Sequence, residues 1–437
     1  MESSEVVNKA VSLLDKGKLF LKIVVIFFMA LALWLPTHLV LDVIRERKGR
    51  QQEAIADISN KWAGSQTVTG PILVIPYQVI GNDEKGNIVS IRKNAYFLPE
   101  KNEITSTIYP EKRKRGIYEV VVYRSETNMN IKFNPLRWRD LNIPIESFKW
   151  TEAALVFSVS DNLKGINEDF YIHWNGQQIV FNPQSPGFTE MTGGFMALVP
   201  FSPGSADSVH HAQMKFHLNG SSKLLFSMSA RENKIEMTSS WPNPSFTGIK
   251  LPDNREVRSG GFTASWKFLN RAVPLVWKDN FYDLSSSAIG TDLLVTVDSY
   301  DKTERSVKYA ILCIMLTFAV FFLVETIYKR PLHLVHYGLA GLALVLFYSL
   351  LLSISEYTGY NLAYVIAGVA TITLVTWFIG SILRSWRLGF FIGLVLAVVY
   401  SYIFTIIQLQ DYALLMGSIG LFIALAIIMY FTKRLQW

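Results

Sequence analysis

The chain alternates between long apolar runs and stretches in which hydrophobic and polar residues take turns. Residues 23–41 (IVVIFFMALALWLPTHLVL) contain no Asp, Glu, Lys or Arg, and five later runs are of similar length and apolar character. A helix rises about 1.5 Å per residue, so roughly 20 residues cross the hydrocarbon core of a membrane. The pattern predicts six membrane-spanning helices, at residues 23–41, 307–328, 334–352, 362–383, 388–407 and 412–431.

The first apolar run resembles both a signal peptide and a membrane anchor. Lys16, Lys18 and Lys22 precede it, as basic residues precede a signal peptide. No small-residue cleavage site follows, because the run ends in Leu39-Val40-Leu41-Asp42. We therefore expect an uncleaved transmembrane anchor, with a kink at Pro36.

Residues 42–306 predict a large folded domain that is mainly antiparallel β-structure. It begins with a helix over 43–62, where Ile55, Ile58 and Trp62 repeat at helical spacing. Strand patterns then follow, and Asn219-Gly220 between two of them predicts a hairpin. We expect ten or more strands in a sandwich or a barrel, including residues 71–80, 116–125, 154–160, 213–218, 224–228 and 262–268.

The charged residues are concentrated in the predicted folded domain and are scarce in the predicted membrane spans. The 437 residues are only 18% charged, yet the net charge is +7. Residues 42–306 contain 31 Lys+Arg and 29 Asp+Glu, a normal density for a soluble domain, whereas residues 307–437 contain 10 charges in all. The domain is therefore only +2, and the surplus flanks the membrane spans. This distribution removes the support that the net charge would lend to nucleic-acid binding.

The basic residues also predict the orientation, because cytoplasmic loops are enriched in Lys and Arg. With a cytoplasmic N-terminus, the cytoplasmic segments are 1–22, 329–333, 384–387 and 432–437, and they hold ten basic residues. The short loops on the other side, 353–361 and 408–411, hold none. We expect both termini in the cytoplasm and the β domain on the far side of the membrane.

The sequence contains no catalytic motif that we can assign. Walker, HExxH, GxSxG and dinucleotide-binding patterns are missing. The one cysteine, Cys313, lies inside an apolar run, where a thiol packs rather than reacts. We predict no catalytic, cofactor-binding or metal-ligating residue, and no cofactor.

Two groups of histidines are the candidate metal ligands. His210, His211 and His217 lie within eight residues, and His217 should point away from the core if 213–218 is a strand. His333 and His336 flank the start of the third span. Surface and interfacial histidines are the favoured interpretation in both cases, with metal binding as the alternative.

Charged residues near the spans give further candidates. Glu325 is the acidic residue within a predicted span and lies one turn from Lys329-Arg330. We favour a structural ion pair with these residues, or a snorkelling contact, over a proton relay. Glu356 and Asp411 should lie at the outer interface. The basic run 112–115 predicts a solvated loop, or alternatively a contact with an anionic envelope surface or a partner.

Glycine spacing predicts close helix packing in the membrane. Gly389 and Gly393 form a GxxxG pair that Ala397 extends by one more step. This pattern does not decide whether the packing is within one chain or between chains.

Several ordered segments resemble the CreD family of bacterial inner-membrane proteins, also called cell envelope integrity proteins. The resemblance covers nearly the whole chain, although the usual His-Pro-x-Gln-Tyr pattern is here His333-Leu334-Val335-His336-Tyr337. The matching segments are RQQEAIADISNKWAGSQTVTGPILVIPY (50–77), FLPE (97–100), KRGIYEVVVY (114–123), DKTERSVKYAILCIMLTFAVFFLVE (301–325) and HYGLAGLALVLFYSLLLSISEYTGYNLAY (336–364).

The resemblance implies a multi-span protein with a periplasmic domain after the first span. It also implies a role in envelope integrity and in responses to cell-wall-active agents, under a sensor kinase and response regulator pair, CreC and CreB. We therefore expect a non-enzymatic envelope protein that contacts the bilayer and other envelope proteins or wall components. The alternatives are a transporter or channel, and an enzyme acting on wall or lipid substrates.

Overall fold

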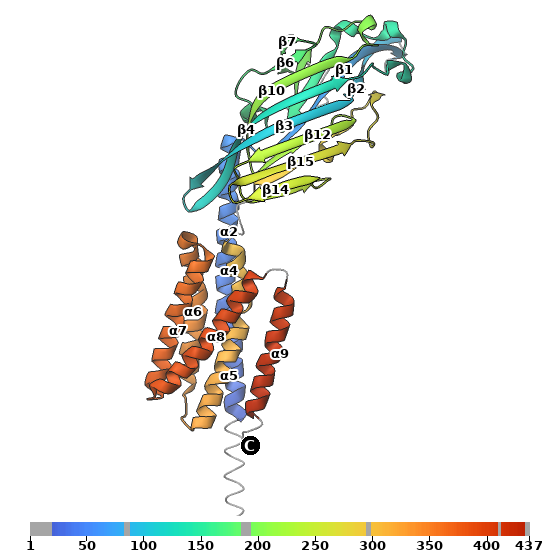
Figure 1. Cartoon of the computed structure of the whole chain (residues 1–437). Helices are drawn as coiled ribbons and strands as arrows, with labels where there is room; N and C mark the ends of the chain where they lie inside the picture. Colours follow the sequence, from blue (N-terminus) through green and yellow to red (C-terminus); the bar gives the residue numbers. More distant parts are fainter. Residues whose placement is uncertain (1–19, 83–87, 185–193, 294–298, 410–411, 433–437) are drawn as a thin grey trace, which may run out of the picture. The chain divides into compact units, whose positions relative to one another are not determined.

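The computed structural model describes residues 20–82, 88–184, 194–293, 299–409 and 412–432. The chain divides into two compact units: Met1–Gln52 with Val297–Trp437, and Glu53–Thr296. The first unit is helical and the second is built from β-sheets, so the predicted combination of a helical membrane protein with a large β domain is confirmed (Figure 1).

Helices make up the first unit. Five helices of the described residues are long and apolar enough to span a membrane, the first of them Phe20–Trp62. The sixth predicted span corresponds to α9, whose apolar part Leu415–Ile427 is shorter, so six spans stay a prediction. The helices are α2 (Trp34–Trp62), α4 (Ser299–Lys308), α5 (Ala310–Tyr328), α6 (Leu334–Thr358), α7 (Tyr360–Ile382), α8 (Trp386–Gln408) and α9 (Ala413–Thr432).

The helices expose many large apolar side chains on the outside of the bundle. On α7, Ala363 and Ala367 are fully buried, whereas Val365 and Val369 are more than half exposed. An apolar outer surface is stable in lipid and unfavourable in water. This arrangement supports a membrane setting for the bundle.

The predicted glycine packing is within the chain. A Cβ on Gly389 would lie 2.7 Å from the Cα of Gly380 on α7, and one on Gly393 would lie 2.2 Å from the hydroxyl oxygen of Thr376. These glycines therefore let α8 approach the backbone of α7 closely.

The first helix extends as predicted beyond its apolar part. It is helical through residues 43–62, and the regular pattern is interrupted at Leu33. Proline lacks an N–H and crowds the preceding turn, so Pro36 accounts for an interruption within one turn before it.

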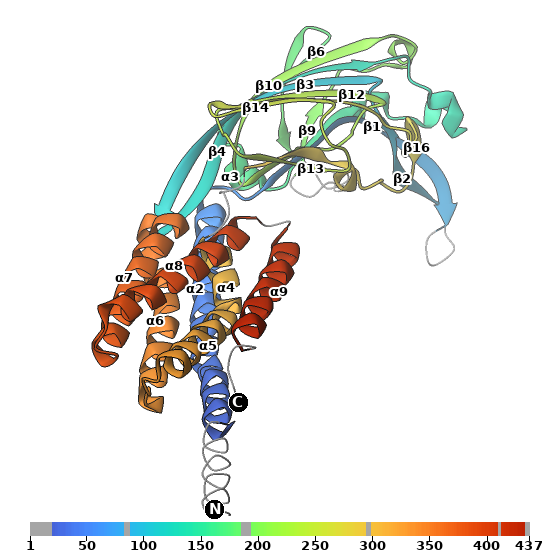
Figure 2. The ribbon, with the colours of Figure 1, turned by 60° about the horizontal axis from the view of Figure 1, so that its bottom comes forward.

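Two sheets make up the β unit. They lie in two layers, which Figure 2 shows edge-on. The nine-stranded sheet contains β13 (Pro244–Gly248), β17 (Ile289–Leu293), β11 (Lys223–Phe226), β1 (Gln66–Asn82), β5 (Ala154–Val159), β9 (Gly194–Leu198) and β8 (Asn182–Pro183) in that order, with β2 (Ile88–Phe97) beside β1 and β16 (Val276–Lys278) beside β2.

The second sheet has eight strands and carries the longest hairpin, β3–β4. Its order is β14 (Asn254–Arg258), β15 (Gly261–Leu269), β12 (Glu232–Ser239), β3 (Lys101–Arg115), β4 (Tyr118–Phe133), β10 (His210–Ser221), β6 (Tyr171–Trp174) and β7 (Gln177–Val180). One short helix, α3 (Asn162–Gly165), follows β5.

One hydrophobic core lies between the sheets and contains residues of both. Phe157 and Phe226 come from the nine-stranded sheet, and Phe216, Ile235 and Trp266 come from the eight-stranded sheet. The fold is therefore a sandwich rather than a barrel. Most pairs are antiparallel, while β1–β11 and β3–β12 are parallel.

The predicted hairpin at Asn219-Gly220 is wrong. Residues on either side do form strands, β10 and β11, but these belong to different sheets. Ser222 adopts a φ of 59°, a left-handed conformation in which the chain leaves one sheet for the other. Leu218 and Leu224 both still reach the shared core, which explains why their alternation resembled a hairpin.

The basic run 112–115 is also not a loop before a strand. It forms the end of β3, where Lys112 pairs with Val121 and Arg115 pairs with Tyr118 of β4. The turn instead comes at Gly116, which has a φ of 60°. The basic residues therefore lie near the tip of the long β3–β4 hairpin.

Candidate functional site

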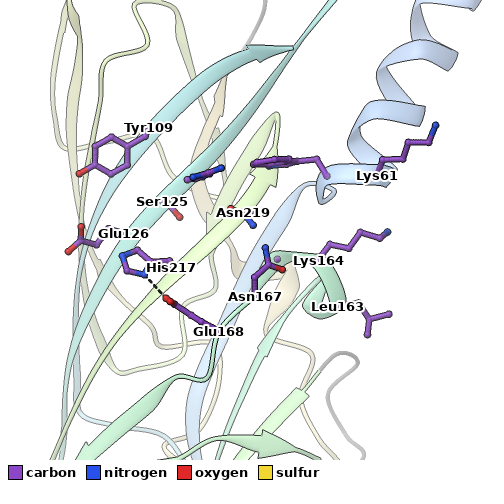
Figure 3. A pocket seen from close by; sticks show the side chains of 13 residues that line it. Lys61, Tyr109, Ser125, Glu126, Leu163, Lys164, Asn167, Glu168, His217 and Asn219 are labelled. Carbon is purple, nitrogen blue, oxygen red and sulfur yellow. Dashed lines mark hydrogen bonds and ion pairs between the residues drawn. The ribbon is translucent and has the colours of Figure 1, made fainter. Parts of the chain in front are cut away.

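A groove lies on the outer face of the eight-stranded sheet. Its floor includes one row of cross-strand neighbours, Tyr109 on β3, Arg124 on β4 and Asn219 on β10. Side chains alternate between the two faces of a sheet. Residues that neighbour core-facing residues therefore point away from the core, and on paired strands they lie side by side. The row brings a phenol, a guanidinium and an amide to one place (Figure 3).

The groove contains two acidic groups, Glu126 in the next row and Glu168 after α3, and each contacts a side-chain nitrogen. Glu126 forms an ion pair with Lys215, and the hydrogen bond from Lys215 lowers the pKa of the Glu126 carboxyl. His217 lies opposite Glu126 in register, and its Nδ1 is 2.5 Å from a carboxylate oxygen of Glu168. Figure 3 shows this His217–Glu168 contact as a dashed line.

The end of α2 provides one wall. Trp62 donates its indole N–H to the Tyr123 carbonyl at 3.3 Å, and the guanidinium carbons of Arg113 and Arg124 lie 5.2 and 5.5 Å from its ring centre. Asp57, just before Trp62 on the same helix, forms an ion pair with Arg115. Cation–π contacts and this ion pair thus attach the helix end to the hairpin.

The α3 segment provides a neighbouring wall. Asp161 accepts a hydrogen bond from the Gly64 N–H at 3.2 Å, which fixes the segment beside the end of α2. Lys164 and Asn167 follow and line the groove, which has a volume of about 730 Å³. Figure 3 shows Asn167 and Asn219 in the middle, with Lys61 and Lys164 to one side.

Arg124 differs from the other charged residues of the groove. Lys61 pairs with Asp57 at 2.9 Å, and Lys164 lies 3.8 Å from Asp161. Within the described part of the chain, the contact of Arg124 is with the Trp62 ring and not with a carboxylate. An exposed guanidinium of this kind can bind an added anion without first breaking an ion pair.

His210 was expected on the surface and is instead in the core. It is 3% exposed and stacks on Trp174 with ring centres 4.9 Å apart. Its Nδ1 lies 2.8 Å from the Asn175 amide nitrogen and its Nε2 lies 2.9 Å from the Ser205 carbonyl oxygen. His210 is the first residue of β10 and faces inward like Ala212 and Met214. The strand therefore begins three residues before the predicted strand at 213–218.

The expectation of surface histidines holds for His211 and His217, while an interfacial position of His333 and His336 stays a prediction. His211 and His217 are exposed. His333 caps α6 by accepting from the Val335 N–H at 3.3 Å, and His336 accepts from the His333 N–H. Among the described residues, no three His, Cys, Asp or Glu side chains are grouped to hold a metal.

Glu325 is paired, but not with the neighbouring basic residues. Its carboxylate forms an ion pair with Lys22 of the first helix and accepts from the Tyr337 hydroxyl at 3.0 Å. Lys22 also donates to the Leu332 carbonyl at 2.7 Å. The prediction of a Lys329-Arg330 partner is therefore wrong, and the side chain of Arg330 donates to the Leu383 carbonyl instead.

Glu356 lies in a second cluster with the first helix. Its carboxylate accepts from the Tyr300 hydroxyl at 2.9 Å and lies 3.8 Å from the Arg47 guanidinium. Lys22 and Arg47 are 25 residues apart, about 37 Å along a helix. The first helix is thus tied to its own unit by a carboxylate at both ends of its apolar part. Asp411 lies outside the described residues.

Cys313 is completely buried on α5. The Thr317 hydroxyl donates to its carbonyl at 2.7 Å. Its position in the packed interior agrees with the packing role expected from the sequence.

The sequence patterns missed the groove as a site. Trp62 was noted for its helical spacing, but Tyr109, Arg124 and Asn219 were not singled out. Each lies on the polar side of an alternating strand, and alternation does indicate that they face outward. Their meeting in one row depends on the register of three strands, which alternation does not determine.

Fold and site together define a class, a multi-span membrane protein whose β-sandwich domain follows its first apolar helix. The family model described as "Inner membrane protein CreD" matches residues 18–437. The chain is also 30% identical over 430 residues to "Inner membrane protein CreD" of Escherichia coli (strain K12), covering 97% of this chain and 94% of that relative. The chain belongs to the CreD family of inner membrane proteins, which confirms the resemblance found in the sequence.

Proposed function

We propose that this inner-membrane protein supports the integrity of the cell envelope by binding an envelope component through its β domain, without catalysing a reaction. The groove on the eight-stranded sheet carries the proposal. Glu126 is paired with Lys215, and Glu168 contacts the His217 ring. Arg124, Tyr109 and Asn219 face outward together in the same groove. Such a surface is suited to binding.

The proposal places the β domain in the periplasm and both termini in the cytoplasm. The bias of basic residues toward one set of loops supports this orientation. The bilayer and other envelope proteins or wall components are then the available partners, and envelope stress is the condition in which binding matters.

A deletion experiment tests this function. Removing the gene from a bacterium that carries it should lower survival under detergent and under cell-wall-active agents, and the full-length gene should restore it. A chain with Arg124→Gln and Tyr109→Ala should be present in the membrane at the same level as the original chain, but it should restore little of the survival. Unchanged survival of the deletion strain would contradict the proposal.

A transporter is the second candidate, because hydroxyl groups converge inside the helical bundle. The Ser306 and Tyr360 hydroxyls are 2.9 Å apart, and the Tyr364 hydroxyl donates to the Tyr400 carbonyl at 2.9 Å. These groups come from α4, α7 and α8. Solute flux into vesicles containing the purified chain, and loss of that flux in Tyr364→Phe, would favour transport.

A further inference from the structure

We propose that the groove binds an oligosaccharide that carries carboxylate groups. The inference rests on the proposed function, since it names the chemical class of ligand for the same site. Three properties of the groove support it. It holds a guanidinium with no carboxylate partner among the described residues, it has aromatic and amide side chains around that guanidinium, and its charged groups are of both signs.

The guanidinium of Arg124 selects a carboxylate. It is exposed and has no carboxylate partner among the described residues, so its planar N–H groups can donate to an anion in the bidentate geometry that carboxylates accept. The Trp62 ring lies 5.5 Å from this guanidinium and limits its freedom to move. The Arg124 guanidinium is therefore a cation in a restricted position at the centre of the row.

The neighbours of Arg124 suit a sugar. Sugar rings present C–H groups on their faces and hydroxyls at their edges, so they pack on aromatic rings and exchange hydrogen bonds with amides. Tyr109 is 56% exposed and Asn219 lies on the other side of Arg124. Asn167 adds a second amide in the groove. At about 730 Å³, the groove falls in the range of roughly 300–1,000 Å³ typical of ligand sites.

The geometry favours a saccharide over an acidic peptide. At Arg124, strand β4 is paired on both sides, by β3 and by β10. Its backbone thus offers no edge to which an extended peptide could add as a strand. A helical peptide would need an apolar groove, whereas this one is lined by charged and amide groups.

The mixed charge favours a ligand with separated anionic groups. Glu126 and Glu168 lie in the same groove as Arg124. A chain with a charge on every unit would place anions beside these carboxylates, which costs free energy. An oligosaccharide that alternates acidic and neutral sugars can place a carboxylate at Arg124 and a neutral ring beside Glu126 and Glu168.

Isothermal titration of the full chain in phosphatidylcholine nanodiscs tests the inference. The probes are two acidic tetrasaccharides, of glucuronic acid or N-acetylmuramic acid alternating with N-acetylglucosamine, and neutral chitotetraose. We expect at least one acidic probe to bind about tenfold or more tightly than chitotetraose, as expected for one charge-assisted contact. Failure of both acidic probes to bind, or equal binding of chitotetraose, would overturn the proposal.

Matched variants separate a specific site from general charge attraction. Arg124→Gln should weaken binding about tenfold or more, while Lys132→Gln should leave it within about twofold, because it removes the same charge from the same strand outside the groove. Tyr109→Ala should weaken binding and Tyr109→Phe should retain it. Equal losses in Arg124→Gln and Lys132→Gln would contradict the inference, as would equally tight binding of a hexaglutamate peptide.

Unfolding of a variant is detected by its circular dichroism and thermal midpoint, and Tyr109→Phe remains as the conservative test. The ligand class and the cellular role can fail separately. If no acidic saccharide binds while the gene still protects cells, the ligand assignment is wrong and the envelope role stands. If acidic saccharides bind while the deletion strain survives normally, the ligand assignment stands and the envelope role is wrong.

Discussion

The burial of His210 predicts that the stability of the β domain depends on pH. Its Nε2 faces a carbonyl oxygen and must carry the proton, so its Nδ1 accepts from the Asn175 amide. Asn175 cannot reverse without losing the bond from the His211 N–H to its oxygen. Burial in the core is the main cause that lowers the pKa of His210 below its ordinary 6.5.

The sign of the resulting pH dependence follows from linkage. Below about pH 6.5 the unfolded chain binds a proton at this residue, whereas the folded domain resists it until the lower pKa is reached. We predict that the thermal midpoint of the β domain falls as the pH is lowered from 7.5 to 5. In His210→Gln this fall should be smaller, as measured by tryptophan fluorescence.

A neighbouring residue is the control for this prediction. His211 is exposed, so His211→Gln should keep the pH dependence of the original protein. If His210→Gln and His211→Gln show the same slope, the buried imidazole is not its cause.

The pair between Lys22 and Glu325 is a second residue-scale test. Both side chains are largely buried, 23% and 13% exposed, and Tyr337 adds a hydrogen bond. We predict that Lys22→Gln lowers the stability of the helical unit by about 1–3 kcal/mol, because it leaves a partly buried carboxylate without its cation. Thermal unfolding in detergent micelles would measure the loss.

The charge reversal Lys22→Glu with Glu325→Lys should recover part of that stability. Lys329→Gln should change it little, although Lys329 lies one turn from Glu325 in the sequence. A larger loss in Lys329→Gln than in Lys22→Gln would show that the pairing seen in the structure is wrong.

At the scale of elements, the close approach of α8 to α7 at Gly389 predicts how a larger side chain there changes stability. Gly389→Ala would place a Cβ 2.7 Å from the Cα of Gly380, a backbone atom that cannot move aside cheaply. We expect a destabilisation of roughly 1–3 kcal/mol, typical of overpacking, measured as a lower thermal midpoint. Gly368→Ala on α7 is the control, because no atom lies within 4 Å of its added Cβ and alanine favours a helix over glycine, so it should not lower the midpoint.

Periodicity determined the elements better than it determined their neighbours. The apolar runs and the alternating runs correspond to helices and strands because both patterns record which side of an element is buried. The strands around Asn219-Gly220 were found, but their assignment to one hairpin failed. Two strands that face one core from opposite sheets have the same alternation as two strands side by side.

At the scale of the whole molecule, the orientation is the prediction to test. Alkaline phosphatase, which is active only outside the cytoplasm, should be active when fused near residue 200 and inactive when fused in the segment 384–387. The ten basic residues on one set of loops are the reason. Activity at the second site and silence at the first would reverse the topology.

The division into a membrane part and a soluble β part follows from the sequence alone. Composition and periodicity are local properties, and transfer of a side chain into lipid or into a core depends mainly on that side chain. Family membership followed as well, since long ordered segments were sufficient to show it.

Only the tertiary structure decided which side chains meet. Lys22 and Glu325 are 303 residues apart, and Tyr109, Arg124 and Asn219 form one row through the register of three strands. His210 entered the core because its strand starts earlier than the polar residues around it suggested. Such meetings depend on how elements pack, and packing is a property of pairs of elements that no single stretch of sequence contains.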